Sequence, residues 1–124
     1  MTAETVLAVD GGNSKADVAL VRADGGLVGA VRGPTISHQA TGLATAAARL
    51  AALIESVRRP GEASPTLAVE CLAGADYPAD VRLLETAFGA LLPDARTVIL
   101  NDTFAALRAG TSRPWGIVLI CGQG

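Results

Sequence analysis

The chain has 124 residues, of which 50% are hydrophobic and only 3% aromatic, and it carries a formal net charge of -2. This length fits one domain with a core built from alanine, valine, leucine and isoleucine. The charge and the lack of Lys/Arg runs argue against nucleic acid, and the lack of a basic leader or a long apolar run argues against a membrane, so we expect a cytoplasmic protein.

Three short strands are predicted first, over residues 5–10, 16–21 and 27–31. The Asp24-Gly25 step between the second and third is typical of a hairpin, so the three should form an antiparallel meander. A polar break at 33–38 then precedes a helix over 42–57, in which apolar residues recur every three or four positions.

The second half alternates strands and helices. A polar linker at 58–65 precedes a nearly continuous apolar strand over 67–72, which should be central in the sheet. A helix begins at Pro78 and ends near Pro93, a strand covers 97–100, and a short helix ends at Gly110. An apolar strand from Trp115 then runs into the final glycines.

This order predicts an α/β domain with a mixed five-stranded sheet, helices on both faces and the start of a sixth strand. A last strand with no following element suggests that residues 1–124 are one lobe of a longer protein. The two cysteines, Cys71 and Cys121, lie in apolar runs and are expected to be buried free thiols, since no CxxC spacing suggests a disulfide or metal site.

The first candidate site is the loop "DGGNSK", residues 10–15. A carboxylate at a strand end, followed by two glycines, can hold Mg²⁺ while the freed backbone amides bind phosphate. The alternative is a plain glycine turn between two strands, which this motif alone favours.

The second candidate is Asp102, in "NDTFAALRAG" directly after a strand. Aspartate at a helix start is ordinarily a cap, and that is the simpler interpretation. The functional alternative is a general base, because ligands of α/β sheets bind at the carboxyl ends of strands.

Two further polar loops complete the set. The glycines of "ICGQG", Gly122 and Gly124, could approach an anion as the first loop does. Ser37, His38 and Asp76 lie in two other loops. A lone histidine such as His38 is more often structural than catalytic, and Asp76 could cap the helix that begins at Pro78.

The three motifs "DGGNSK", "NDTFAALRAG" and "GIVLICGQG", in this order, resemble the N-acetylglucosamine kinase and BadF/BadG/BcrA/BcrD-type ATPase family. That family belongs to the superfamily of actin, hexokinase and the heat-shock chaperone ATPases. The resemblance spans the chain but corresponds only to the N-terminal lobe, and it implies a ribonuclease H-like sheet. No Walker P-loop is present, so phosphate would be bound by hairpins.

The resemblance implies ATP and Mg²⁺ as cofactors and a sugar as substrate. Asp10 would lie near Mg²⁺, and Asp102 would accept the proton of the attacking hydroxyl. The matches to the first phosphate motif are Asp10, Gly11, Gly12, Asn13, Ser14 and Lys15; those to the second are Gly122, Gln123 and Gly124. Ser37, His38 and Asp76 match sugar-contacting positions.

Two positions depart from the family pattern. Gln123 stands where the family has threonine, so a hydroxyl contact to phosphate is lost there while the backbone contacts of the two glycines stay available. Ser37 stands where the family has asparagine, so the sugar is less defined than the nucleotide. We expect a kinase for N-acetylglucosamine or a related hexose that is inactive as this lobe alone. The alternatives are an ATPase of the reductase-activator type and a non-catalytic nucleotide- or sugar-sensing domain. Whether the chain is a monomer or a homodimer stays open; an exposed half-cleft would favour self-association.

Overall fold

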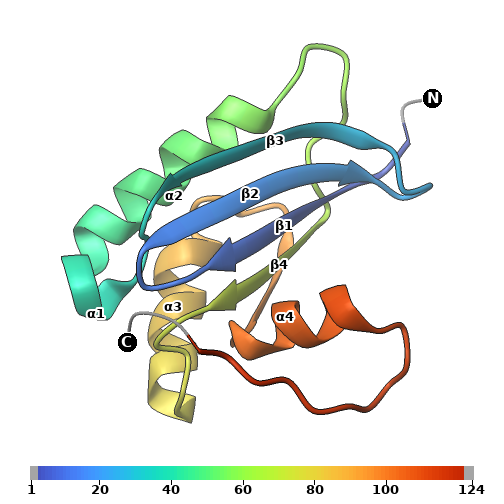
Figure 1. The fold of residues 1–124 in the computed structure, drawn as a ribbon. Coiled ribbons are helices and arrows are strands. Elements are labelled where there is room, and N and C mark those ends of the chain that lie inside the picture. The colour runs from blue at the N-terminus through green and yellow to red at the C-terminus, as the bar shows by residue number, and fades with distance from the viewer. Residues whose placement is uncertain (1–2, 122–124) are drawn as a thin grey trace.

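The fold is an α/β arrangement around a five-stranded mixed sheet, in a computed structural model that describes residues 3–121 (Figure 1). The strands are β1 (Thr5–Gly11), β2 (Lys15–Arg22), β3 (Leu27–Pro34), β4 (Leu67–Leu72) and β5 (Arg96–Asn101), in the order β3-β2-β1-β4-β5. β1, β2 and β3 pair antiparallel, whereas β4 runs parallel to β1 and β5 runs parallel to β4. The predicted meander and mixed sheet are confirmed.

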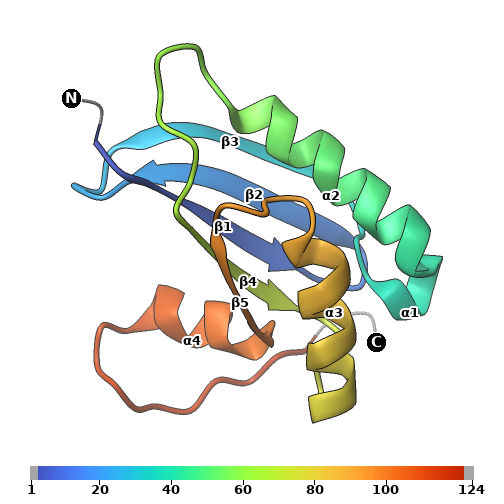
Figure 2. The same cartoon turned by 180° about the vertical axis from the view of Figure 1, so that it is seen from behind.

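Four helices accompany the sheet: α1 (His38–Thr41), α2 (Leu43–Val57), α3 (Pro78–Gly89) and α4 (Thr103–Gly110). Helices α2 and α3 cover one face, and α4 lies on the other face against β4 and β5, so helices occupy both faces as predicted (Figure 2). None of the helices within residues 3–121 is long and apolar enough to cross a bilayer.

The core lies between the sheet and helices α2 and α3. The apolar side of α2 places Leu50, Leu53, Ile54 and Val57 in this layer, at the spacing of one helix face. Leu7 and Val9 of β1 are likewise buried, because alternate residues of a strand face the same side.

Two helix boundaries differ from the prediction. Gly42 has a φ of +84°, which separates the unpredicted short helix α1 from α2. Helix α3 ends at Gly89 rather than near Pro93, because the amides of Leu91 and Leu92 bond back three residues, to Phe88 and Gly89, and close a tighter turn.

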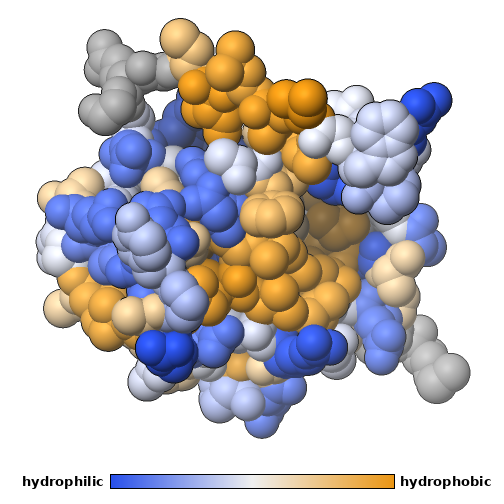
Figure 3. Space-filling view, turned by 90° about the horizontal axis from the view of Figure 1, so that it is seen from below, coloured by the Kyte–Doolittle hydropathy of each residue, from blue (hydrophilic) through white to orange (hydrophobic). Residues whose placement is uncertain are grey.

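The predicted sixth strand is wrong for residues 115–121, which form no strand; the remaining Gly122, Gln123 and Gly124 lie outside the described residues. A strand needs a hydrogen-bonded neighbour, and within residues 3–121 this segment pairs with no strand of the sheet. Its apolar side chains are therefore exposed, Ile117 at 99% and Leu119 at 89%. Figure 3 shows apolar side chains gathered over this segment and α4.

A close approach of β3 to the end of α2 gives a testable consequence. A Cβ on the buried Gly29 would lie 2.9 Å from the backbone oxygen of Val57. Gly29→Ala should therefore lower the free energy of unfolding by about 1–3 kcal/mol, measured by urea denaturation. Gly110→Ala is the matched control, since a Cβ there meets nothing within 4 Å. Equal midpoints for both variants would contradict the packing argument.

Candidate functional site

The candidate site lies where β1, β4 and β5 end. These three strands are parallel, so their carboxyl ends share one edge of the sheet, where α/β proteins bind ligands. Asp10 lies near the end of β1, Asp76 follows β4, and Asp102 follows β5. The fold thus brings three separate segments of sequence to one edge.

The β1–β2 turn is a tight hairpin. The amide of Gly12 donates to the carbonyl of Lys15 at 2.9 Å, and the Thr35 hydroxyl donates to the carbonyl of Gly12 at 2.8 Å. Within residues 3–121, the amides of Asn13 and Ser14 donate to no acceptor, and both residues are exposed. These two amides and the ammonium of Lys15 are the donors that the loop can offer to an anion.

The two glycines of this loop have different roles. A Cβ on Gly11 would lie 2.9 Å from Leu72 Cδ2 and 3.0 Å from Ile36 Cγ1, so packing alone favours a glycine there. A Cβ on Gly12 would lie 3.4 Å from the nearest atom, the Lys15 carbonyl oxygen. Gly11 therefore has a packing reason to be a glycine, which the sequence pattern did not reveal, and its phosphate role stays a prediction.

Asp10 and Asp102 share a small pocket. It has a volume of about 180 Å³, and Gly12, Lys15 and Asp17 also line it. Burial raises the pKa of Asp10, and the charges of Asp17 and Asp102 raise it further, against the lowering effect of Lys15 and Arg32. The structure thus brings the "DGGNSK" loop and Asp102 together around an acidic pocket that Lys15 also lines.

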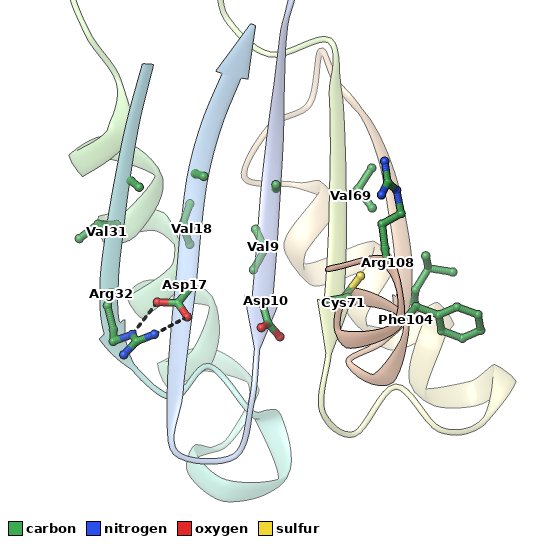
Figure 4. Close-up of a pocket in the computed structure, with 15 residues that line it drawn as sticks. Val9, Asp10, Asp17, Val18, Val31, Arg32, Val69, Cys71, Phe104 and Arg108 are labelled. Atoms are coloured by element: carbon green, nitrogen blue, oxygen red, sulfur yellow. Dashed lines mark hydrogen bonds and ion pairs between the residues drawn. The ribbon is translucent and has the colours of Figure 1, made fainter. Parts of the chain in front are cut away.

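Asp17 and Arg32 belong to this region, although the sequence analysis assigned neither. Asp10, Asp17 and Arg32 are successive register partners across β1, β2 and β3, and Figure 4 shows them side by side. Arg32 donates to both Asp17 oxygens, at 2.7 and 3.1 Å, and this hydrogen-bonded pairing lowers the pKa of Asp17. Counting outward from the Asn13-Ser14 turn would have placed Asp17 opposite Asp10.

The loops that carry Ser37, His38 and Asp76 lie against one another. A Cβ on Gly74 would be 2.8 Å from His38 Cε1, and His38 Nε2 lies 3.8 Å from Asp80 Oδ1. His38 Nδ1 is buried without a hydrogen-bond partner in the described part of the chain. The histidine therefore sits at the junction of both loops, with one ring nitrogen unsatisfied.

Ser37 and Asp76 make local contacts that qualify their predicted roles. The buried Ser37 caps α1, its hydroxyl accepting from the Ala40 amide at 3.3 Å. Asp76 does not cap α3; Asp80 accepts from the Tyr77 amide at 3.1 Å instead, and Asp76 accepts from Asn101 at 2.8 Å. Sugar contacts by these residues stay predictions.

The face of the sheet beside α4 is open over β1, β2 and β3. A cavity of about 690 Å³ lies there, with mainly apolar walls and with Asp10, Arg32 and Arg108 among its polar lining groups (Figure 4). Cys71 is buried and free as predicted, and burial followed by the charge of Asp10 raises the pKa of its thiol. Cys121 is free but exposed, contrary to the prediction, because its segment has no strand partner.

The residues present fit a magnesium ion that is shared with a nucleotide. Among residues 3–121, no group of three or more His, Cys, Asp or Glu side chains is placed to hold a metal by itself. Mg²⁺ normally keeps several waters and takes one or two carboxylates together with substrate phosphates. Asp10, beside a loop with free amide donors, meets that requirement.

Comparison with known proteins supports the fold. No family model and no curated protein matches the chain. The crystal structure of a "Putative N-acetylglucosamine Kinase" from Chromobacterium violaceum matches with a TM-score of 0.56 at 19% identity, over 88% of this chain and 40% of that one. The chain is therefore similar to a kinase-like α/β lobe and spans about 40% of that protein's length. The narrower ribonuclease H-like and actin-like assignment stays a prediction.

Proposed function

We propose that this chain is the N-terminal lobe of an ATP-dependent sugar kinase that uses Mg²⁺ and acts on N-acetylglucosamine or a related hexose. The observation that carries the proposal is the pocket that Asp10, Lys15 and Asp102 share. These residues come from two separate motifs, and Asp10 and Asp102 are 92 positions apart in the sequence. The similarity in fold to a protein described as a kinase of this kind supports it.

Each residue has a distinct task in this proposal. Lys15 and the amides of Asn13 and Ser14 bind and orient the terminal phosphates of ATP. Asp10 holds Mg²⁺, which neutralises charge on the phosphates when bound. Gly122 and Gly124 are proposed to contact the phosphates from the second motif, with Gln123 between them.

Asp102 completes the chemistry. A sugar hydroxyl oxygen attacks the terminal phosphorus, the bond from that phosphorus to the ADP oxygen breaks, and the hydroxyl proton passes to the Asp102 carboxylate. His38 and Asp76 are proposed to bind other hydroxyls of the sugar and so to fix which one attacks. Catalysis of phosphoryl transfer comes almost entirely from such positioning together with electrostatic stabilisation.

The test is an ADP-release assay on the protein expressed from its complete reading frame, with a panel of hexoses and amino sugars. Sugar-dependent ADP release, with a phosphorylated sugar as product, is the expected result. Hydrolysis that is independent of any sugar would overturn the proposal and favour an ATPase of the reductase-activator type. Nucleotide binding without turnover would favour a sensing domain.

A further inference from the structure

Asn101, the last residue of β5, joins two other parts of the site through its side chain. Its amide nitrogen donates to Asp76 Oδ1 at 2.8 Å. Its carbonyl oxygen accepts from the Thr103 amide at 3.1 Å and from the Thr103 hydroxyl at 2.7 Å. The side chain therefore ties the loop after β4 to the start of α4.

These bonds identify Asn101 as the residue that caps α4. A capping residue has extended backbone, and its side-chain oxygen accepts from the amide two or three positions later. Asn101 is in a strand and accepts from Thr103, two positions later. Asp102 has helical backbone, with φ -62° and ψ -22°, and makes no capping hydrogen bond.

The interpretation of Asp102 as the cap of α4 is therefore wrong. The first amides of a helix need acceptors, and an aspartate beside them normally supplies one. Asn101 supplies that acceptor, so the Asp102 carboxylate is left to line the pocket with Asp10 and Lys15.

We propose that Asn101 is a positioning residue: by capping α4 and holding Asp76, it keeps the Asp102 carboxylate free for the reaction and fixes the Asp76 loop beside it. This inference rests on the proposed function for its kinetic consequences, but its structural content does not.

The side-chain chemistry explains why asparagine suits this position. The Thr103 groups both donate, so they need an acceptor, whereas the Asp76 carboxylate needs a donor. An asparagine amide has both, with its oxygen and nitrogen on opposite sides. Aspartate would keep the acceptor but would place a second carboxylate against Asp76.

Two substitutions at this position separate its two bonds. Asn101→Ala removes both, and crystal structures of the 124-residue chain should show the Asp102 side chain turned to accept from the Phe104 or Ala105 amide. Asn101→Asp keeps the cap, so Asp102 should stay in place while the Asp76 loop moves away. Adding Asp76→Asn to Asn101→Asp restores the hydrogen bond with its direction reversed, because the new amide at position 76 donates to the new carboxylate at position 101. The loop should then return to its wild-type position.

The same two substitutions should also have different effects on kcat and KM. In the active protein, Asn101→Ala should lower kcat by about 10²-fold, because the proton acceptor is misplaced, with nucleotide affinity unchanged. Asn101→Asp should raise the KM for sugar with a smaller effect on kcat. A purely structural residue would not split kcat from KM between two variants at one position.

The outcomes are decisive in both directions. An Asn101→Ala structure with Asp102 and the Asp76 loop unmoved would overturn the proposal, as would unchanged kcat in an active enzyme. If Asn101→Ala does not fold, the same structures of Asn101→Asp and its double variant decide whether this bond holds the loop. If the wild-type protein phosphorylates no sugar, the proposed function fails, and the structures still decide whether Asn101 caps α4.

Discussion

Asp102→Asn is expected to lower sugar-dependent turnover by about 10²–10⁴-fold while ATP binding is retained. The amide cannot accept the proton of the attacking hydroxyl, and general-base catalysis contributes about this factor. Steady-state ADP release gives kcat and KM, and titration calorimetry gives the affinity for the nucleotide. The loss should fall on kcat, since the substitution preserves the size of the side chain.

The structure makes this variant a clean test. Asp102 makes no capping hydrogen bond, so its replacement by asparagine should leave the thermal unfolding midpoint close to that of the wild type. Asp94→Asn is the matched control, an exposed aspartate in the turn before β5, and it should keep full activity. Full turnover in Asp102→Asn would remove the general-base assignment while leaving nucleotide binding by the first loop untouched.

Much of the fold could be predicted because its signals are local. Strand 67–72 has the same bounds in the sequence and in the structure, since a continuous apolar run between polar breaks marks a buried strand. The predicted sixth strand failed because a strand depends on a partner as well. Residues 115–121 are apolar as a strand would be, but strand formation also needs pairing, and these residues pair with no strand of the described sheet.

The residues of the candidate site likewise fall into those with a local sequence signal and those that depend on distant partners. Asp10 and Asp102 could be paired from sequence because one ends a predicted strand and the other follows one, and the ends of parallel strands meet. The contribution of Asn101 could not be predicted. Both residues of the Asn101-Asp102 pair are ordinary helix caps, and only their backbone angles show which of them caps α4. Asp17 was missed because its partner Arg32 is 15 positions away on another strand.

Glu70 was also missed, inside the strand that was predicted most accurately. It is 1% exposed, its register partners are Val9 and Ile99, and its Oε1 has no hydrogen-bond partner in the described residues. Burial among these groups raises the pKa of its carboxyl from 4.5 to about 7. A carboxyl with a raised pKa stays protonated in the folded protein after it has ionised in the unfolded chain.

This difference makes the stability of the protein depend on pH in a definite direction. Below pH 4.5 the carboxyl is protonated in both states, so the contribution of Glu70 to stability is fully present. As the pH rises from 4.5 to about 7, ionisation favours the unfolded chain, and about 3 kcal/mol is lost. Above about pH 7 both states are ionised and the contribution is constant.

Glu70→Gln should remove this loss, because a glutamine does not ionise. Urea denaturation from pH 5 to 8 should show the wild type weakening as pH rises and the variant nearly unchanged, with the variant more stable at pH 8 by about 3 kcal/mol. Glu85→Gln, an exposed glutamate on α3, should follow the wild type at every pH. If wild type and Glu70→Gln lose stability in parallel as the pH rises, the Glu70 carboxyl is solvated in the folded protein. Water would then reach the core between β4 and helices α2 and α3, contrary to the burial seen in the structure.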